Sequence, residues 1–252
     1  MKSLLRWLGL ALAAVVALQL FFVLRIAAMA VLDPHSTSFQ RSEAWRLQSE
    51  KGRLPWRQQW LAYDQISDYL KKAVIASEDD GFTNHEGVDW DALEKAWQKN
   101  ARAEAQIAKN QARKSSGATA GAAKPAARPA KVVGGSTITQ QLAKNLFLSG
   151  ERTLLRKGQE FVLTLVLEAL LSKQRILEIY LNSVEWGEGI FGAEAAAQHY
   201  FRKPAARLSA YEAARLAVML PRPKYFEKLP NSSYLAERAA VIASRLVGAE
   251  LP

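Results

Sequence analysis

Residues 134–145 read GGSTITQQLAKN, a glycine pair and several hydroxyl residues followed by the start of a helical pattern. Thr137 and Gln140 have the spacing of a capping box, which predicts that a helix begins at this point. The free backbone N–H groups and the positive dipole end of such a helix form a potential anion site. The segment is not a phosphate-binding P-loop, because the pattern G-x-x-x-x-G-K-[ST] is absent. An ordinary capped helix would also explain these residues.

The predicted helix has an apolar and a polar face. The apolar face should point to the core and consists of Ile138, Leu142 and Leu146. The polar residues cannot all share that face and are expected to line a groove. They are Gln141, Lys144 and Asn145.

A second polar cluster lies upstream, where residues 76–87 read ASEDDGFTNHEG. Its three acids follow the apolar end of a helix, a junction where a carboxylate can be partly desolvated. Desolvation raises the pKa of a carboxyl group toward the range useful for a general base. Gly81 and Gly87 allow tight turns that would bring Phe82 and His85 beside the acids. The acids are Glu78, Asp79 and Asp80. Taken alone, the cluster is better explained as a helix terminus with solvated acids and a satisfied histidine.

A third cluster consists of charged residues spaced along the next predicted helix. Arg152, Arg156 and Glu160 recur at i, i+4 and i+8, so they would form one stripe of two cations and a carboxylate. Lys157 neighbours the stripe. Residues 161–171 are almost continuously apolar, so the stripe should lie where this helix enters the core, as a wall of a cleft. Judged alone, a surface ion pair between Arg156 and Glu160 is the simpler explanation.

The remaining pattern is helical nearly throughout, and no convincing alternating strand is present. Apolar residues follow a 3.6-residue spacing at 66–74, 176–180 and 213–220. A chain of 252 residues is long enough for one well-packed domain and an anchor. We expect a mainly α domain at residues 63–235, a polar and partly helical connector at 34–62, and a C-terminal helix and tail at 236–252.

The N-terminus predicts a membrane anchor within residues 1–33. Residues 8–24 are uncharged and almost wholly apolar, and residues 26–32 extend a run that can cross a bilayer as a helix. Lys2 and Arg6 precede the run and Asp33 follows it, so the positive-inside rule places the N-terminus in the cytoplasm and the remainder outside. A cleaved signal peptide is the alternative, but the run is longer than a usual signal core.

The composition limits the partners and metal sites of the protein. The formal net charge of +10 suggests an anionic partner, which could be nucleic acid, acidic lipid or a phosphorylated substrate. The absence of cysteine excludes disulfides and thiolate metal sites. Residues 101–131 hold many cations and little apolar bulk, and are interpreted as a basic, mobile insertion whose first part can form a helix. A solvated loop explains this insertion, and contact with anionic lipid is the sharper hypothesis.

Together, these segments resemble the peptidoglycan glycosyltransferases, specifically the monofunctional biosynthetic type. Residues 134–145 match that family's second motif almost letter for letter, residues 176–182 (ILEIYLN) resemble the fourth, and residues 213–221 resemble the last. The first motif is resembled by Glu78, Asp79, Phe82, His85 and Gly87, and the third by Arg152, Arg156, Lys157 and Glu160. Five motifs in order are far more specific than any one alone. The segment between the first two motifs exceeds the family norm by about the length of the basic insertion.

The resemblance implies a lysozyme-like helical glycosyltransferase domain with a membrane-proximal hydrophobic surface and one N-terminal transmembrane helix. The donor would be the growing glycan chain on undecaprenyl diphosphate and the acceptor lipid II, joined with inversion to a β-1,4 link. The protein would lie in the bacterial inner membrane with a periplasmic catalytic domain. Other cell-wall synthases or division proteins are possible partners. Nucleic acid is not expected, because the anchor would hold the domain outside the cytoplasm.

The implied chemistry assigns roles to the clustered residues. Glu78 is expected to be the general base, and Glu160 to orient cations or to hold a divalent ion, Mg²⁺ or Mn²⁺, on the diphosphate. No tightly bound cofactor is expected. The cations that would stabilise the leaving diphosphate are Lys144, Arg152, Arg156 and Lys157. The other expected substrate contacts are Asp79, Phe82, His85, Ser136, Thr137, Gln141 and Asn145.

Two other functions explain part of the sequence. A lytic enzyme that cleaves peptidoglycan also uses a catalytic glutamate, but it releases no diphosphate and does not need the cationic group. A non-enzymatic membrane adaptor would need the basic surface but not Glu78. A bifunctional penicillin-binding protein is set aside, because the S-x-x-K and K-T-G motifs are absent.

Overall fold

The computed structural model describes residues 2–116, 135–151 and 153–252. The chain forms two compact units, a larger one of Met1–Val88 with Thr137–Pro252 and a smaller one of Asp89–Ser136. In its described part the smaller unit holds one long helix, α4 (Trp90–Ser116), whose first turn is capped by the Asp89 carboxylate, which accepts from the backbone N–H of Ala92 at 2.8 Å. The prediction that the first part of the basic insertion is helical is confirmed up to Ser116. Residues 117–134 lie outside the described residues.

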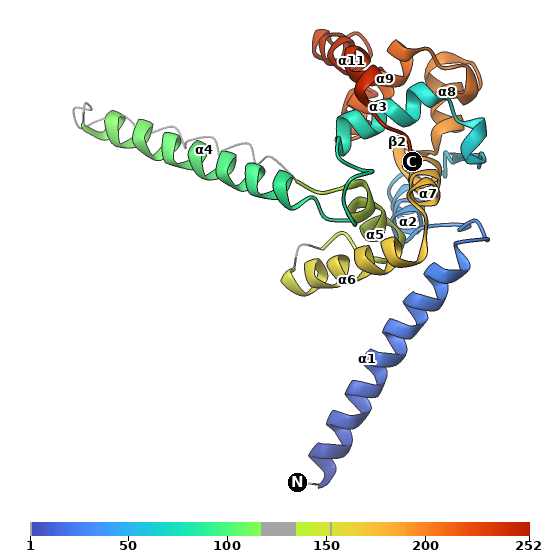
Figure 1. The fold of residues 1–252 in the computed structure, drawn as a ribbon, viewed down its shortest axis with the longest axis vertical. Helices are drawn as coiled ribbons and strands as arrows, with labels where there is room; N and C mark the ends of the chain where they lie inside the picture. The colour runs from blue at the N-terminus through green and yellow to red at the C-terminus, as the bar shows by residue number, and fades with distance from the viewer. Residues whose placement is uncertain (1, 117–134, 152) are drawn as a thin grey trace. The chain divides into compact units, whose positions relative to one another are not determined.

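The N-terminal helix α1 (Lys2–Ala28) projects from the other helices of the larger unit (Figure 1). Among the described residues it is the one helix long and apolar enough to cross a membrane, as the sequence predicts. Its C-terminal end meets the folded domain, where Ile26 and the following Met29 are buried. The Arg175 guanidinium donates to the Met29 carbonyl at 2.8 Å and forms an ion pair with Asp33, also at 2.8 Å. This end of α1 is therefore part of the domain's packing.

The connector after α1 contains one helix, α2 (Ser38–Lys51). The sequence predicts such a partly helical connector. Thr37 and Gln40 form a capping box at its start, and Gly52 ends it with a left-handed φ of +63°. The Gln40 amide also donates to the Ser183 carbonyl at 3.3 Å, and Leu47 is fully buried. The connector is thus fastened to the helical domain.

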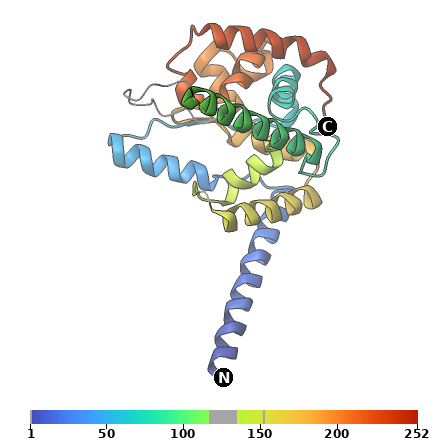
Figure 2. The same ribbon diagram turned by 90° about the vertical axis from the view of Figure 1, so that its left-hand side faces the viewer.

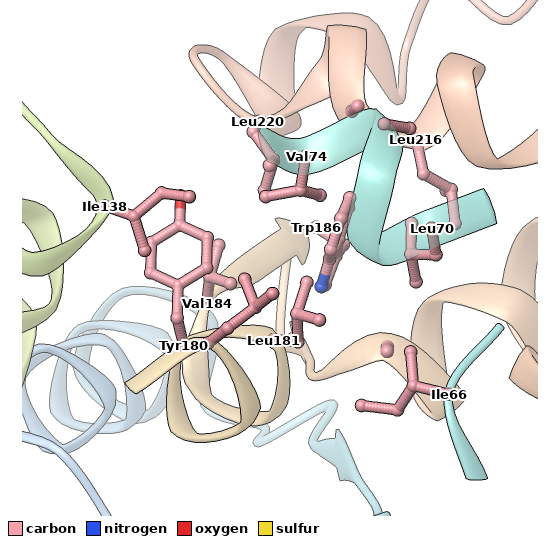
Figure 3. Close-up of a cluster of buried hydrophobic side chains, with 14 of the residues drawn as sticks. Ile66, Leu70, Val74, Ile138, Tyr180, Leu181, Val184, Trp186, Leu216 and Leu220 are labelled. Carbon is pink, nitrogen blue, oxygen red and sulfur yellow. The ribbon is translucent and has the colours of Figure 1, made fainter. Parts of the chain in front are cut away.

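The core of the larger unit lies between two groups of helices. One group consists of α3 (Asp68–Glu78), α9 (Ala210–Met219) and α11 (Ser233–Arg245), which pack against one another. The other group consists of α5 (Ile138–Phe147), α6 (Leu154–Leu170) and α7 (Lys173–Ser183). Figure 3 shows buried side chains from both groups around Trp186, with Leu70 and Val74 from α3 and Tyr180 and Leu181 from α7. This shared core fixes α3 opposite α5 and α7.

Three very short strands form a sheet that the sequence pattern does not reveal. The strands are β1 (Arg57–Gln58), β2 (Glu185–Gly187) and β3 (Ile190–Phe191), in the order β1-β3-β2. Two or three residues cannot display an alternating pattern, which is why they were missed. Gly189 has a φ of +72°, and a Cβ there would lie 1.7 Å from the Pro55 carbonyl oxygen, so the β2–β3 turn requires glycine.

The remaining elements are short and complete the larger unit. They are η1 (Tyr63–Gln65), α8 (Ala193–Phe201), η2 (Ala205–Arg207), α10 (Pro223–Phe226) and η3 (Leu246–Gly248). Figure 2 shows the same ribbon from the side, where α11 runs along one end of the larger unit and α6 lies at the end nearest α1. The expectation of a mainly α fold is confirmed, with the small sheet as an addition.

Candidate active site

Glu78 is the last residue of α3, and its carboxylate faces α5. The Gln141 amide of α5 donates to Glu78 Oε2 at 3.0 Å. The same Gln141 side chain accepts at its Oε1 from the hydroxyl of Tyr180, a buried residue of α7, at 2.9 Å. Since its oxygen is held by a phenol, the amide of Gln141 must present its N–H to Glu78. A chain of two hydrogen bonds thus orients the predicted base.

The pKa of Glu78 is shifted in the direction that general base catalysis requires. Burial raises the pKa of the Glu78 carboxyl, the hydrogen bond from Gln141 opposes this rise, and the charge of Asp79 adds to it. Burial also raises the pKa of the Tyr180 hydroxyl, so this group stays a hydrogen-bond donor. The raised pKa makes the Glu78 carboxylate a better proton acceptor than an exposed glutamate.

Asp79 is buried and joins three parts of the site. Its Oδ2 accepts from the backbone N–H of Ile138, the first residue of α5, at 2.9 Å, and its Oδ1 lies 2.9 Å from His85 Nε2. A carboxylate at a helix N-terminus is favoured by the helix dipole. The anion expected at the start of α5 is therefore supplied by the protein itself. In this structure the Asp79 and His85 side chains contact each other. That these two side chains also contact the substrate stays a prediction.

The turn after His85 is locked against α5 and α6. The Thr137 hydroxyl donates to the Gly87 carbonyl at 2.6 Å and accepts from the Gln140 N–H at 3.2 Å, which confirms the capping box. A substrate contact by Thr137, which stays a prediction, would have to replace its bond to Gly87. Gly87 has a φ of +84°, and a Cβ on it would lie 2.7 Å from Thr164 Cγ2. The turn thus needs both the torsional freedom and the small size of glycine.

Substituting Gly87 with alanine is expected to lower the free energy of unfolding by about 3 kcal/mol, because the new methyl group meets α6 and the left-handed backbone is strained. The shift would be measured by urea unfolding of the detergent-solubilised protein. Gly150→Ala is the matched control, because no atom lies within 4 Å of a Cβ there. Equal stability of the two variants would show that the turn tolerates a side chain.

Phe82, the remaining predicted contact of the first motif, is fully buried and belongs to the core. Lys173 Nζ lies 4.6 Å from the centroid of the Phe82 ring and 2.9 Å from Glu168 Oε1. Thr139 of α5 donates to the same Glu168 oxygen at 2.5 Å. In this structure the Phe82 side chain packs into the core, and its contact with a substrate stays a prediction.

The exposed face of α5 carries the polar residues that the sequence assigns to it. Ile138, Leu142 and Leu146 are fully buried, as predicted from their spacing. Lys144 is exposed one turn beyond Gln141, and Asn145 is partly exposed beside it. Ser136 belongs to the smaller unit and is not placed relative to these residues.

Two residues of the predicted charged stripe, Arg156 and Glu160, lie on α6. Arg156 Nη1 lies 2.9 Å from Glu160 Oε2, and Lys157 Nζ lies 2.5 Å from Glu160 Oε1. The Glu160 side chain is only 5% exposed, so its charge is compensated where α6 enters the core. The described part of α6 begins at Leu154 after its cap Thr153. Arg152 itself lies outside the described residues.

Tyr180, Glu168 and Lys173 were not predicted from the sequence as site residues. Tyr180 lies inside the ILEIYLN segment, where its spacing indicates only a buried position. Its hydroxyl meets Gln141, which is 39 positions away in the sequence. A buried tyrosine hydroxyl needs a hydrogen-bond partner, and this need was the available signal. A single sequence does not reveal that Gln141 is the partner.

Comparison with known proteins places this arrangement in a family. The model of the family described as transglycosylase matches residues 48–118 and 109–247. The chain belongs to the transglycosylase family. The resemblance to this family is thereby confirmed, and the lysozyme-like helical fold with it.

Several curated relatives cover nearly the whole transglycosylase. A protein of Burkholderia thailandensis is 53% identical over 251 residues, which cover 98% of this chain and 88% of the relative. A protein of Burkholderia pseudomallei is 51% identical with the same coverage, and one of Burkholderia multivorans is 49% identical over 95% of this chain and 88% of its own length. Each relative is named biosynthetic peptidoglycan transglycosylase. The transglycosylase is therefore an enzyme that transfers glycosyl groups.

Proposed function

We propose that this transglycosylase polymerises the glycan strands of peptidoglycan from lipid II. The acceptor is lipid II, and the donor is the growing chain on its undecaprenyl diphosphate. The observation that supports this most directly is the hydrogen bond between Glu78 and Gln141. It joins a desolvated carboxylate to the helix that carries Lys144, and α6 with its partly buried Arg156–Glu160 pair packs against that helix.

In the proposed reaction Glu78 accepts the proton of the acceptor's 4-hydroxyl as that oxygen attacks the anomeric carbon of the donor. A sugar hydroxyl is a weak nucleophile at neutral pH, so a positioned base lowers the barrier. The new carbon–oxygen bond forms on the face opposite the leaving group, which inverts the α-linked donor to a β-1,4 link. The bond from the anomeric carbon to the diphosphate oxygen breaks, and undecaprenyl diphosphate leaves with the electron pair.

The leaving diphosphate gathers negative charge during bond breaking, and fixed cations would stabilise it. The structure favours Arg156 for this role, because Glu160 fixes its guanidinium and only 16% of its side chain is exposed. A preoriented cation needs no reorganisation when the charge develops. The proposed set also includes Lys144, Lys157 and Arg152, with Gln141, Ser136 and Thr137 as hydrogen-bond donors.

A divalent ion is proposed only as a companion of the substrate diphosphate. Both oxygens of Glu160 already accept from cations, from Arg156 at one and Lys157 at the other. A metal held directly by Glu160 does not fit this arrangement, since it would have to displace one of them. Mg²⁺ or Mn²⁺ bound to the diphosphate itself would meet no such conflict. No step of the proposed reaction depends on the ion.

The proposed location is the bacterial inner membrane, with α1 as a single-pass anchor and the catalytic domain in the periplasm. The basic residues before the span favour a cytoplasmic N-terminus. The substrates are held in the same membrane by their undecaprenyl chains, so an anchored enzyme meets them in two dimensions. Contacts with other cell-wall synthases or division proteins stay a prediction.

The product of the reaction tests the proposal. The detergent-solubilised protein incubated with lipid II should yield glycan strands longer than the disaccharide and free undecaprenyl diphosphate, separated by gel electrophoresis and chromatography. The same preparation incubated with purified sacculi should release no fragments. Fragments from sacculi without polymer from lipid II would instead favour a lytic enzyme, and neither product would favour a membrane adaptor.

A further inference from the structure

The outer half of α1 presents one narrow face to the folded domain. Gln19, Phe22, Val23, Ile26 and Met29 are partly or fully buried, and the residues between them are exposed except for the partly buried Arg25. Their spacing of three or four residues defines a single stripe along the helix. The contact therefore depends on how α1 is rotated about its own axis.

Gln19 and Gln159 form a reciprocal pair of hydrogen bonds at the inner end of this stripe. Gln19 Nε2 donates to Gln159 Oε1 at 3.0 Å, and Gln159 Nε2 donates to Gln19 Oε1 at 3.1 Å. Gln159 directly precedes Glu160 and follows Arg156 by one turn of α6. The pair thus connects the anchor to the same turns of α6 that hold the cation and its partner.

With α1 as the proposed membrane span, the Gln19–Gln159 pair would lie beside the bilayer's apolar layer. Arg175, which binds the Met29 carbonyl and Asp33, marks the polar boundary at the outer end of α1. Gln19 lies ten residues before Met29, so it is about 15 Å deeper at the helical rise per residue. A hydrocarbon core of about 30 Å would contain it. In such surroundings each amide needs the other, because no water is present to replace its hydrogen bonds.

The surface of α6 is compatible with the same depth. Leu154 and Leu155 are 92% and 87% exposed at its first turn, and Val162 and Leu165 are exposed further along. Such an apolar surface is costly in water and is favourable against acyl chains. The glutamine pair and the apolar surface are therefore both compatible with contact between α6 and the apolar layer of the bilayer.

We propose that α1 positions α6 through the Gln19–Gln159 pair, so that the anchor helps to hold Arg156 and Glu160 in place for the substrate's diphosphate. Gln19 and Gln159 are positioning residues, since they act through α6. The contact between the helices stands on its own geometry, and its effect on activity rests on the proposed function.

The contact is tested by cross-linking in membranes. The chain has no cysteine, so Gln19→Cys with Gln159→Cys creates the only two thiols. A short bifunctional thiol reagent is used, because two extended glutamines exceed the Cα separation that a disulfide allows. The pair should cross-link within one chain. Leu20→Cys with Gln159→Cys is the matched control, since Leu20 lies on the exposed face of α1. Cross-linking no stronger than in this control would overturn the proposal.

The effect on activity is tested with leucine at both positions. An interhelical hydrogen bond in a membrane changes an equilibrium by about threefold on average, so losing two should reduce kcat/KM for lipid II about eightfold in Gln19→Leu or Gln159→Leu. The double variant should be no worse than either single variant, because no unpaired amide remains. Leu20→Ala should behave as the wild type. The positioning role would be contradicted if the single variants kept the wild-type kcat/KM. It would also be contradicted if the loss in the double variant equalled the product of the two single losses. An inactive wild type that still cross-links would instead count against the proposed function.

Discussion

Replacing Glu78 with glutamine is expected to slow lipid II polymerisation by at least about a hundredfold, the usual contribution of a general base. Glutamine preserves the size of the side chain and can still accept the hydrogen bond from Gln141, so the fold should be unchanged. It cannot take a proton from the acceptor's hydroxyl at neutral pH. The measurement is the initial rate of lipid II consumption, with circular dichroism as the check on folding.

The pH dependence of the same reaction provides a second check on Glu78. Burial raises the pKa of this carboxyl, so the fraction that is ionised and able to accept a proton falls as the pH decreases through the raised value. The wild-type rate should decline on that acid limb, and the residual rate of Glu78→Gln should not follow it. Asp80→Asn removes a charge at the exposed neighbouring position and should retain the wild-type rate and profile. A Glu78→Gln variant with nearly full activity would show that another group takes the proton.

Arg156→Gln should reduce the turnover number by roughly a hundredfold, as expected when a preorganised charge-stabilising group is removed from a transition state. Its guanidinium is fixed 2.9 Å from Glu160 and partly shielded from water, so its charge is poorly screened. The measurement is kcat for lipid II at saturating substrate. Arg238→Gln, on the exposed surface of α11, removes the same charge and should leave kcat unchanged.

A purely structural role for Arg156 would give a different pattern. Removing it leaves the buried Glu160 with Lys157 as its one remaining cationic partner among the described residues, which by itself can disturb α6. The double variant Arg156→Gln with Glu160→Gln removes that uncompensated charge. Activity that stays low in the double variant supports a direct role of the cation on the diphosphate. Recovery of activity would contradict that role and assign Arg156 to the packing of α6.

Features of the site that depend on neighbouring residues were predictable from the sequence. The capping box of Thr137 and Gln140, the buried face of α5 and the Arg156–Glu160 pair each involve positions within one or two helical turns. Local spacing determines such contacts, because a helix fixes the relative direction of its side chains. The mainly α fold followed from the same periodicity.

Contacts between distant segments were not predictable from a single sequence. Asp79 caps a helix that begins 59 positions later, and Gln19 meets a glutamine 140 positions away. Periodicity assigned Asp79 to a polar cluster but could not tell a substrate contact from a bond to the backbone. The short strands were not predicted for a further reason. Their pairing depends on the β2–β3 turn and on Pro55 rather than on their own composition.

The hydrogen bonds that link Tyr180, Gln141 and Glu78 have a stereochemical consequence. Gln141 occupies Oε2 of the glutamate, so an incoming proton would arrive on the other oxygen, Oε1. The carboxylate would then work with one designated lone-pair direction, and the attacking hydroxyl could approach productively from one side only. If the acceptor sugar were bound in a different orientation, its hydroxyl would not face Oε1, and the proton transfer to Glu78 would be slow.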